Sequence, residues 1–228
     1  MFSARPSEPL SEGDLALVFL IAIILPIFSY AAHLRDKHRH ATGRRRPLRE
    51  QYAQSMLLLW SLSAAIATLW FSTRRPPAEL GFVVNASPWF LGALGVALVG
   101  SLLYASQILA VRTSASARKQ LVDQLNAQPG VADILPKTEP EMRAFRLVAV
   151  SAGFTEELIF RGYLIWALAH WMPAWAAAVC SLGVFTLAHL YQESPRALLG
   201  VLFAGAAATL LVGLGGSLLP AMLLHAAI

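Results

Sequence analysis

The sequence predicts an all-α protein, a polytopic bundle of about 6–7 transmembrane helices. The first observation behind this prediction is composition: 57% of the 228 residues are hydrophobic and 14% are charged. Soluble domains are typically about 45–50% apolar and about 25% charged. The second observation is that the apolar residues fall in long runs, and about 20 largely apolar residues suffice to span a bilayer.

Seven apolar runs are candidate spans. The first is too long for the apolar core of a cleaved signal peptide, so we expect it to be retained. Pro140, after Thr138 or Glu139 and with Glu141 in the first turn, is expected to start the fourth. The last run is too short to span alone. The runs are 15–34, 52–72, 88–111, 144–170, 173–191, 195–213 and 216–228.

These runs divide the chain into three parts. Residues 1–111 hold the N-terminal transmembrane helices, and residues 112–143 form a polar cytoplasmic linker. Residues 144–228 form the transmembrane core that carries the candidate site. Apolar residues at helical spacing within 118–125 predict a short surface helix in the linker.

Charge asymmetry predicts the orientation in the membrane. Seven of the 18 Lys and Arg residues fall within 35–49, and a basic loop beside a span is cytoplasmic by the positive-inside rule. In a soluble protein such a run could bind nucleic acid, but here we expect no nucleic-acid partner. Alternation then places 73–87 outside, where Arg74 and Arg75 are a mild conflict. We expect an integral, multi-pass protein of the bacterial inner membrane.

The stretch from Glu156 to Gly162, Glu-Glu-Leu-Ile-Phe-Arg-Gly, places two acids and a base inside the fourth span. An ionisable residue at that depth costs roughly 2.5–3.5 kcal/mol by insertion scales, so it marks a candidate functional site. Glu157 and Arg161 are i,i+4 neighbours that can neutralise each other. Glu156 points about 100° away, lacks a local counter-ion, and is the predicted general base. The alternative is that both acids belong to a structural polar cluster.

Two histidines interrupt later apolar runs. His189 ends the fifth run, four residues after Phe185, so both lie on one helix face, and His225 lies deeper in the last run. Alone, His189 could equally be an interface residue. With Glu156, however, the two histidines supply the groups needed to activate a water and stabilise an oxyanion. The other histidines are assigned no function: His33, His38, His40 and His170.

One expectation about depth is in tension with the rest. On the predicted topology His189 lies near the cytoplasmic end of its span, whereas Glu156 lies about 12 residues, roughly 18 Å, into its own. The two depths agree if the cavity opens towards the cytoplasm, or if the fourth helix begins earlier, is tilted or is partly soluble.

Together these residues give the ordered pattern EExxxR, FxxxH and H. It resembles the pattern of the CAAX-protease and bacteriocin-processing (CPBP, Abi) family of intramembrane endopeptidases, the type II prenyl-protein endopeptidases. The resemblance covers about residues 140–228, and Phe185 matches its second motif. The family's last motif ends in Asn or Asp, which would fall at position 229, after Ile228.

The resemblance implies a role for each matching residue. Glu156 would be the catalytic glutamate, His189 its partner in positioning the water, and His225 the oxyanion-side histidine. Glu157 and Arg161 would be the supporting pair. Because Glu and His can activate water directly, we favour a mechanism without a cofactor. The alternative left open is a zinc ion held by Glu156, His189 and His225 with one open position.

The implied activity is an intramembrane endopeptidase that cleaves near the C-terminus of a lipidated or membrane-anchored protein or peptide. Its expected partners are that substrate and the lipid bilayer. Two other functions stay open. One is a catalytically inactive immunity or scaffold protein of the same fold, and the less favoured one is a proton-coupled transporter that uses the buried acids.

Overall fold

The computed structural model describes residues 9–44, 46–126 and 129–227, and every regular element among them is a helix, which confirms the all-α prediction. The elements of the N-terminal half are α1 (Glu12–Phe19), η1 (Leu20–Ile24), α2 (Leu25–Ala41), α3 (Leu48–Ser72), η2 (Pro77–Leu80), α4 (Pro88–Thr113), α5 (Ala115–Asn126) and α6 (Pro129–Ile134). Those that follow are α7 (Glu139–Glu156), η3 (Glu157–Leu164), α8 (Ile165–Leu168), α9 (Ala174–Ala188), η4 (Leu190–Gln192), α10 (Pro195–Gly215) and α11 (Leu219–Ala227).

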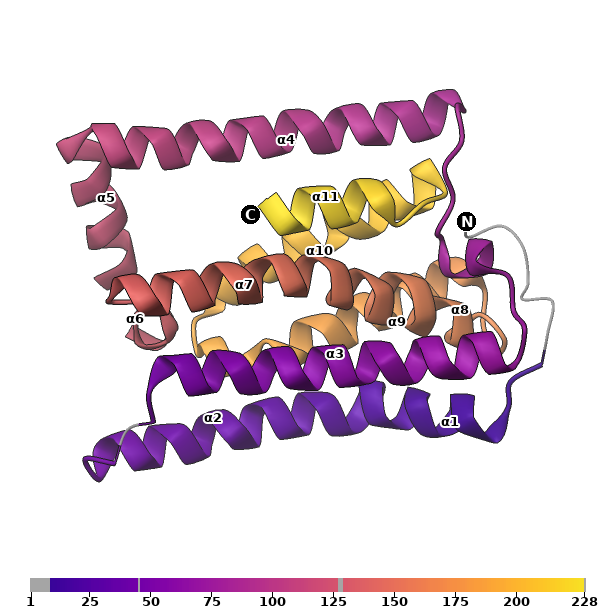
Figure 1. Cartoon of the computed structure of the whole chain (residues 1–228), viewed down its shortest axis with the longest axis horizontal. Helices are drawn as coiled ribbons and strands as arrows, with labels where there is room; N and C mark the ends of the chain where they lie inside the picture. The colour runs from indigo at the N-terminus through magenta and orange to yellow at the C-terminus, as the bar shows by residue number, and fades with distance from the viewer. Residues whose placement is uncertain (1–8, 45, 127–128, 228) are drawn as a thin grey trace.

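The N-terminal helices form a long antiparallel pair (Figure 1). Helices α1, η1 and α2 are one continuous run, and α3 returns beside it. The run begins with a capping box, in which the Ser11 hydroxyl accepts a hydrogen bond from the Asp14 N–H and the Asp14 carboxylate accepts one from the Ser11 N–H. At the other end, Arg46 of the basic loop pairs with Asp36 at 2.6 Å.

The central helical run is α7, η3 and α8, which extends without a break from Glu139 to Leu168. Thr138 caps it, with Pro140 in the first turn and Glu141 completing a capping box, as the sequence predicts. Every residue from Ile159 to Ala167 is buried, and the run contacts α3, α9, α10 and α11. The most charged of the expected spans is therefore the one that the other helices shield.

Helix α11 is short and lies against both α7 and α4. Its contact with α7 depends on Gly153, because a Cβ atom there would lie 2.5 Å from the backbone nitrogen of Ala226. Ala226 directly follows His225, so this close helix contact sets how near His225 lies to α7. Helix α4 covers α10 and α11 from outside.

A buried ion pair, which we call the anchor cluster, joins the N-terminal helices to the central run. It consists of Asp14, Arg75 and Tyr163. Arg75 donates to both carboxylate oxygens of Asp14, at 2.8 and 2.7 Å, and the Tyr163 hydroxyl donates to Asp14 Oδ1 at 3.0 Å. The Arg75 guanidinium also lies over the Trp166 ring, 4.6 Å from its centroid. Because Arg75 is neutralised inside the bundle, it no longer conflicts with the predicted orientation.

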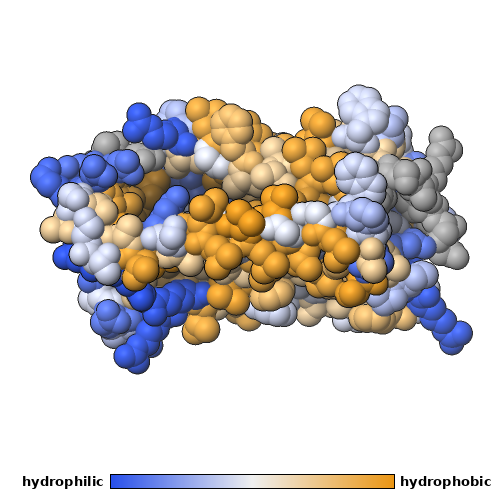
Figure 2. All heavy atoms as spheres, turned by 90° about the horizontal axis from the view of Figure 1, so that it is seen from above, coloured by the Kyte–Doolittle hydropathy of each residue, from blue (hydrophilic) through white to orange (hydrophobic). Residues whose placement is uncertain are grey.

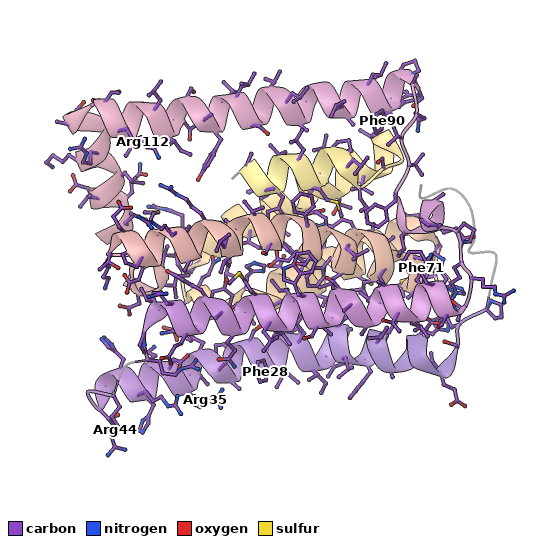
Figure 3. The ribbon with its side chains drawn as sticks, viewed as in Figure 1. Phe28, Arg35, Arg44, Phe71, Phe90 and Arg112 are labelled. Carbon is purple, nitrogen blue, oxygen red and sulfur yellow. The ribbon has the colours of Figure 1, made fainter. Side chains whose placement is uncertain are left out.

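Five helices of the described residues are long and apolar enough to cross a membrane, which supports an integral membrane protein. They cover 12–41, 48–72, 88–113, 174–192 and 195–215. Figure 2 shows a band of apolar side chains across the middle of the molecule, with hydrophilic side chains gathered towards its two ends. Figure 3 places Arg35, Arg44 and Arg112 at one end and Phe71 and Phe90 towards the other. The long axis of the bundle therefore runs across the bilayer.

Two of the seven expected spans differ from these five. The helix that holds the apolar run 144–170 begins at Glu139, beside the expected Pro140, and is less apolar than the five because Arg146, Glu156, Glu157 and Arg161 interrupt it. The run expected at 216–228 forms only the short helix α11, as its length predicts; Ile228 lies outside the described residues. Both nevertheless belong to the bundle, so the polytopic helical architecture is as predicted.

Candidate active site

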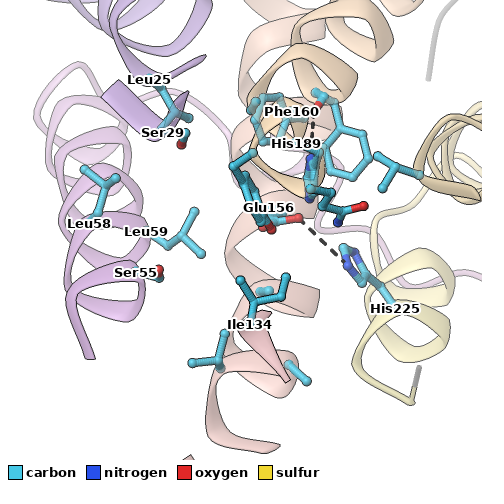
Figure 4. A pocket seen from close by; sticks show the side chains of 18 of the residues that line it. Leu25, Ser29, Ser55, Leu58, Leu59, Ile134, Glu156, Phe160, His189 and His225 are labelled. Carbon is cyan, nitrogen blue, oxygen red and sulfur yellow. Dashed lines mark hydrogen bonds and ion pairs between the residues drawn. The ribbon is translucent and has the colours of Figure 1, made fainter. Parts of the chain in front are cut away.

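A cavity of about 550 Å³ opens between the N-terminal helices and the C-terminal ones. Glu156, His189 and His225 all line it, and Figure 4 shows them around one space. Glu156 and His189 thus reach the same cavity despite the difference in their expected depths. Glu157, Arg161 and Phe185 also line the cavity.

Glu156 ends α7 at the point where the helix widens into the π-helical turn η3. Its side chain is 13% exposed, and Glu156 Oε2 lies 3.9 Å from His225 Nε2. That separation is longer than a hydrogen bond. Glu156 is therefore a largely buried carboxyl whose charge is only loosely compensated, in contact with a cavity.

Glu157 is buried and joins two partners through one oxygen. Its Oε1 atom lies 3.2 Å from Arg161 Nη1, which donates to it, and 2.8 Å from His225 Nδ1. The i,i+4 pair with Arg161 is the one expected from the sequence. The bond to His225 was not expected, because the sequence analysis placed that histidine only beside the oxyanion. Glu157 Oε2 is buried and has no hydrogen-bond partner among the described residues.

Arg161 ties the central run to α10 and α9. It donates from Nη2 to the Gly205 carbonyl at 3.1 Å and from Nε to the Thr209 hydroxyl at 3.4 Å. Its guanidinium lies over the Phe185 ring, 4.1 Å from the centroid. A Cβ atom at Gly205 would lie 2.9 Å from Arg161 Nη2, so only glycine leaves room for this contact. Neither Gly205 nor Thr209 was predicted to belong to the site.

His189 follows the last residue of α9 and is oriented by that helix. Its Nδ1 atom lies 2.8 Å from the Phe185 carbonyl oxygen. Because a carbonyl oxygen only accepts, we assign the proton to Nδ1, which leaves Nε2 of the neutral ring as an acceptor. The Phe185 and His189 rings are in contact, 4.6 Å between centroids, as their spacing predicts. Tyr191, which was not among the predicted site residues, also lies near His189, with 5.8 Å between the ring centroids.

The cavity has an apolar part and a polar end. Apolar side chains of α2, α3 and α7 line the first part, and Arg46 and Asp36 of the basic loop region line the second. The Asp36 carboxylate accepts hydrogen bonds from Arg46 and raises the pKa of its guanidinium. The apolar residues are Leu25, Phe28, Leu58, Leu59, Phe145 and Val148.

The described residues contain no group of three or more His, Cys, Asp or Glu side chains arranged to hold a metal ion. Glu156, His189 and His225 share the cavity, where His189 Nδ1 is bonded to the Phe185 carbonyl and His225 Nδ1 to Glu157. Both Nε2 atoms are left without these bonds, and an outer hydrogen bond of this kind is usual for a metal-ligating histidine, so the residue types would suit zinc through Nε2. The same residues can hold a water: a carboxylate as base and an imidazole nitrogen as acceptor facing the same space.

His33 is the histidine that the sequence analysis undervalued. It lines the cavity, and its Nε2 atom lies 3.1 Å from Glu193 Oε1. A signal was present: Leu25, Ser29, His33 and Asp36 follow helical spacing, and all four line the cavity.

Residues 139–228 match the family model described as Type II CAAX prenyl endopeptidase Rce1-like. The match includes all six residues of the predicted motifs. No curated protein and no solved structure matches the chain.

Proposed function

We propose that this chain, whose residues 139–228 match the Rce1-like type II CAAX prenyl endopeptidase model, is an intramembrane endopeptidase. It cleaves near the C-terminus of a lipidated or membrane-anchored protein. The observation that carries the proposal is Glu156, a largely buried carboxyl, 13% exposed, that faces a cavity shared with His189. Buried acids of this kind, beside a cavity and without a close counter-ion, are typical of catalytic sites.

In the proposed reaction, Glu156 accepts a proton from a water that also donates to His189 Nε2. The water oxygen forms a bond to the scissile carbonyl carbon, and the peptide C–N bond then breaks. Glu156 returns the proton to the leaving amine nitrogen, so it acts first as base and then as acid. Glu157 accepts from His225 Nδ1, which turns Nε2 towards Glu156, the side on which the oxyanion forms. The ring donates to the oxyanion from Nε2 in its doubly protonated form, since Nδ1 already carries the proton shared with Glu157.

The cavity favours a substrate with an apolar chain next to its scissile bond. Leu58, Leu59 and Phe145 form an apolar wall of the cavity. The cavity volume of about 550 Å³ falls within the roughly 300–1,000 Å³ common for ligand sites. Its polar end adjoins the basic loop at 35–49, which we place on the cytoplasmic side of a bacterial inner membrane. A substrate anchored in the cytoplasmic leaflet would then enter from that end.

Comparison of protein C-termini by mass spectrometry tests the proposal. Membranes are taken from cells carrying the wild-type protein, the Glu156→Gln variant or the Glu12→Gln control, in which an exposed carboxyl far from the cavity changes in the same way. We expect one or more membrane-anchored proteins to keep a C-terminal tail only in Glu156→Gln cells.

Two other outcomes would contradict the proposal. If no C-terminus differs although a phenotype of the gene persists in the variant, the inactive immunity or scaffold function is favoured. If Glu156→Gln changes ion flux without altering any terminus, the carboxyl serves proton transfer instead, as in a transporter.

A further inference from the structure

An ion-pair cluster outside the predicted motifs connects α2 to the turn that carries His189. Lys37 Nζ lies 2.9 and 2.7 Å from the two carboxylate oxygens of Glu193, and His33 Nε2 lies 3.1 Å from Oε1. Lys37 and His33 belong to α2, outside residues 139–228, whereas Glu193 follows η4. The contact therefore joins the N-terminal helices to the candidate active site.

Backbone hydrogen bonds within this turn couple the position of Glu193 to that of His189. The His189 carbonyl accepts from the Gln192 N–H at 3.1 Å, and the Leu190 carbonyl accepts from the Glu193 N–H at 3.2 Å. Glu193 itself has φ 47°, in the left-handed region that non-glycine residues seldom occupy. Such a conformation persists only where the surroundings enforce it. The two partners on α2 supply that constraint.

The same contact closes one wall of the cavity. His33 on α2 and Tyr191 and Gln192 of η4 all line the cavity, and α2 packs along both α9 and η4. The contact between α2 and η4 is thus held by the ion pairs of Glu193 with Lys37 and His33, beside the cavity. Movement of the turn away from α2 would displace His189 and widen the cavity together.

We propose that Glu193, held by Lys37 and His33, is a positioning residue that fixes the His189 turn against α2 for the reaction. The hydrogen bond from Lys37, and then the adjacent His33 ring, hold the pKa of Glu193 below its ordinary value, so the carboxylate stays ionised at neutral pH. Exposed ion pairs contribute little to global stability. Misplacement of a catalytic group by about 1 Å, in contrast, can lower a rate by about 10²-fold. We therefore expect loss of the Glu193 ion pairs to lower kcat more than it lowers the stability of the fold.

The kinetic test rests on the proposed endopeptidase activity. The purified protein and its variants Glu193→Gln, Lys37→Glu and Lys37→Glu/Glu193→Lys are assayed on one substrate peptide. We expect either single change to lower kcat about tenfold with KM within about twofold, and the exchanged pair to recover most of the loss. The matched control is Asp123→Asn, which breaks another exposed ion pair, with Lys119, far from the cavity, and should leave kcat unchanged.

A second readout does not depend on activity. In a Cys180→Ala background, a Gln192→Cys variant reports the exposure of the turn through its rate of reaction with a water-soluble maleimide. We expect Glu193→Gln to raise that rate about fivefold or more and the exchanged pair to restore it. Unchanged labelling and unchanged kcat in the single variants would overturn the positioning role. If labelling responds as expected but the wild-type protein cleaves nothing, the anchored turn stands and the proposed protease function fails.

Discussion

The central helical run carries two buried ionic clusters, and they differ in how completely their charges are matched. In the anchor cluster, one carboxylate meets one guanidinium, and both Asp14 oxygens accept hydrogen bonds from Arg75. The second group, which we call the cavity cluster, consists of Glu156, Glu157, Arg161 and His225. It holds two carboxyls for one guanidinium, and Glu157 Oε2 has no hydrogen-bond partner among the described residues.

The difference indicates different roles for similar chemistry. Arg75 Nε has no hydrogen-bond partner among the described residues either, so the two clusters differ in charge balance and not in complete satisfaction. A buried pair with matched charges offsets much of the large cost of removing those charges from water, and breaking it leaves one charge uncompensated. The anchor residues Asp14, Arg75 and Tyr163 are absent from the described lining of the cavity. The cavity cluster keeps an extra acid next to open space, where a substrate can meet it. The comparison predicts that the first cluster controls stability and the second controls reactivity.

Glu156→Gln gives the largest expected effect and falls on the cavity cluster. We expect peptide hydrolysis by the purified protein to drop about 10²–10⁴-fold, because the amide cannot accept the proton of water. The melting temperature in detergent should stay the same or rise, since a loosely compensated buried charge is removed. A variant that unfolds with its activity per folded molecule intact would place Glu156 in a structural cluster, the alternative left by the sequence.

Arg75→Met, at the anchor cluster, is expected to lower stability and to leave activity unchanged, the reverse of Glu156→Gln. Removal of one partner from this buried pair should lower the free energy of unfolding by about 3–5 kcal/mol, while kcat per folded molecule stays near that of the wild type. The double variant Asp14→Asn/Arg75→Met should regain much of the stability, because no uncompensated charge remains. Chemical denaturation of the detergent-solubilised protein measures both changes. Equal instability of the single and double variants would show that packing of Arg75 on Trp166 matters more than its charge.

Gly153→Ala tests the link between helix packing and the cavity cluster. The added Cβ would lie 2.5 Å from the Ala226 backbone, so α11 must shift and take His225 with it. We expect a loss of about 1–3 kcal/mol in stability, typical of overpacking, together with lower kcat. Gly200→Ala on α10 is the matched control, since nothing lies within 4 Å of its Cβ position. If both variants behave alike, the position of α11 does not set the geometry of the site.

The two clusters were also unequally predictable from the sequence. Glu157 and Arg161 lie one helical turn apart, so local spacing alone predicts their contact. The anchor contact between Asp14 and Tyr163 joins residues 149 positions apart, and only the assembled bundle brings them together. For the same reason the sequence analysis treated Arg75 as a loop residue on the outer side.

Long-range contacts likewise account for the surprises within the site. His225 was identified from its depth in an apolar run, but its bond to Glu157 spans 68 positions and sets a ring orientation that spacing cannot give. His33 was assigned to the basic loop because its neighbours are charged, although helical spacing from Leu25 places it on the cavity face. The motif thus identified residues that share one cavity, and the tertiary packing that orients them had to be seen in the structure.

The smallest expected effect is a pH dependence at Glu193, which lies outside both clusters. Its pKa is lowered from 4.5, mainly by the hydrogen bond from Lys37 and then by the adjacent His33 ring. A lowered folded pKa means that the stabilisation is present above 4.5 and is lost as the pH falls through the folded value. The wild type should therefore melt about 1–2 °C above Glu193→Gln at neutral pH, and the difference should vanish in acid.

Thermal melting from pH 7 down to pH 3 in one detergent measures this difference, with Glu12→Gln as the control for an exposed carboxyl. A gap between wild type and Glu193→Gln that stays constant with pH would mean that the carboxylate charge contributes nothing to the turn. The same measurement is repeated in the Arg75→Met background. If the melting-temperature difference closes in acid, and has the same size in that background, the turn beside His189 responds to charge independently of the anchor cluster. The contrast between the two ionic clusters would then extend to the periphery of the site, where a weak exposed ion pair controls position without controlling overall stability.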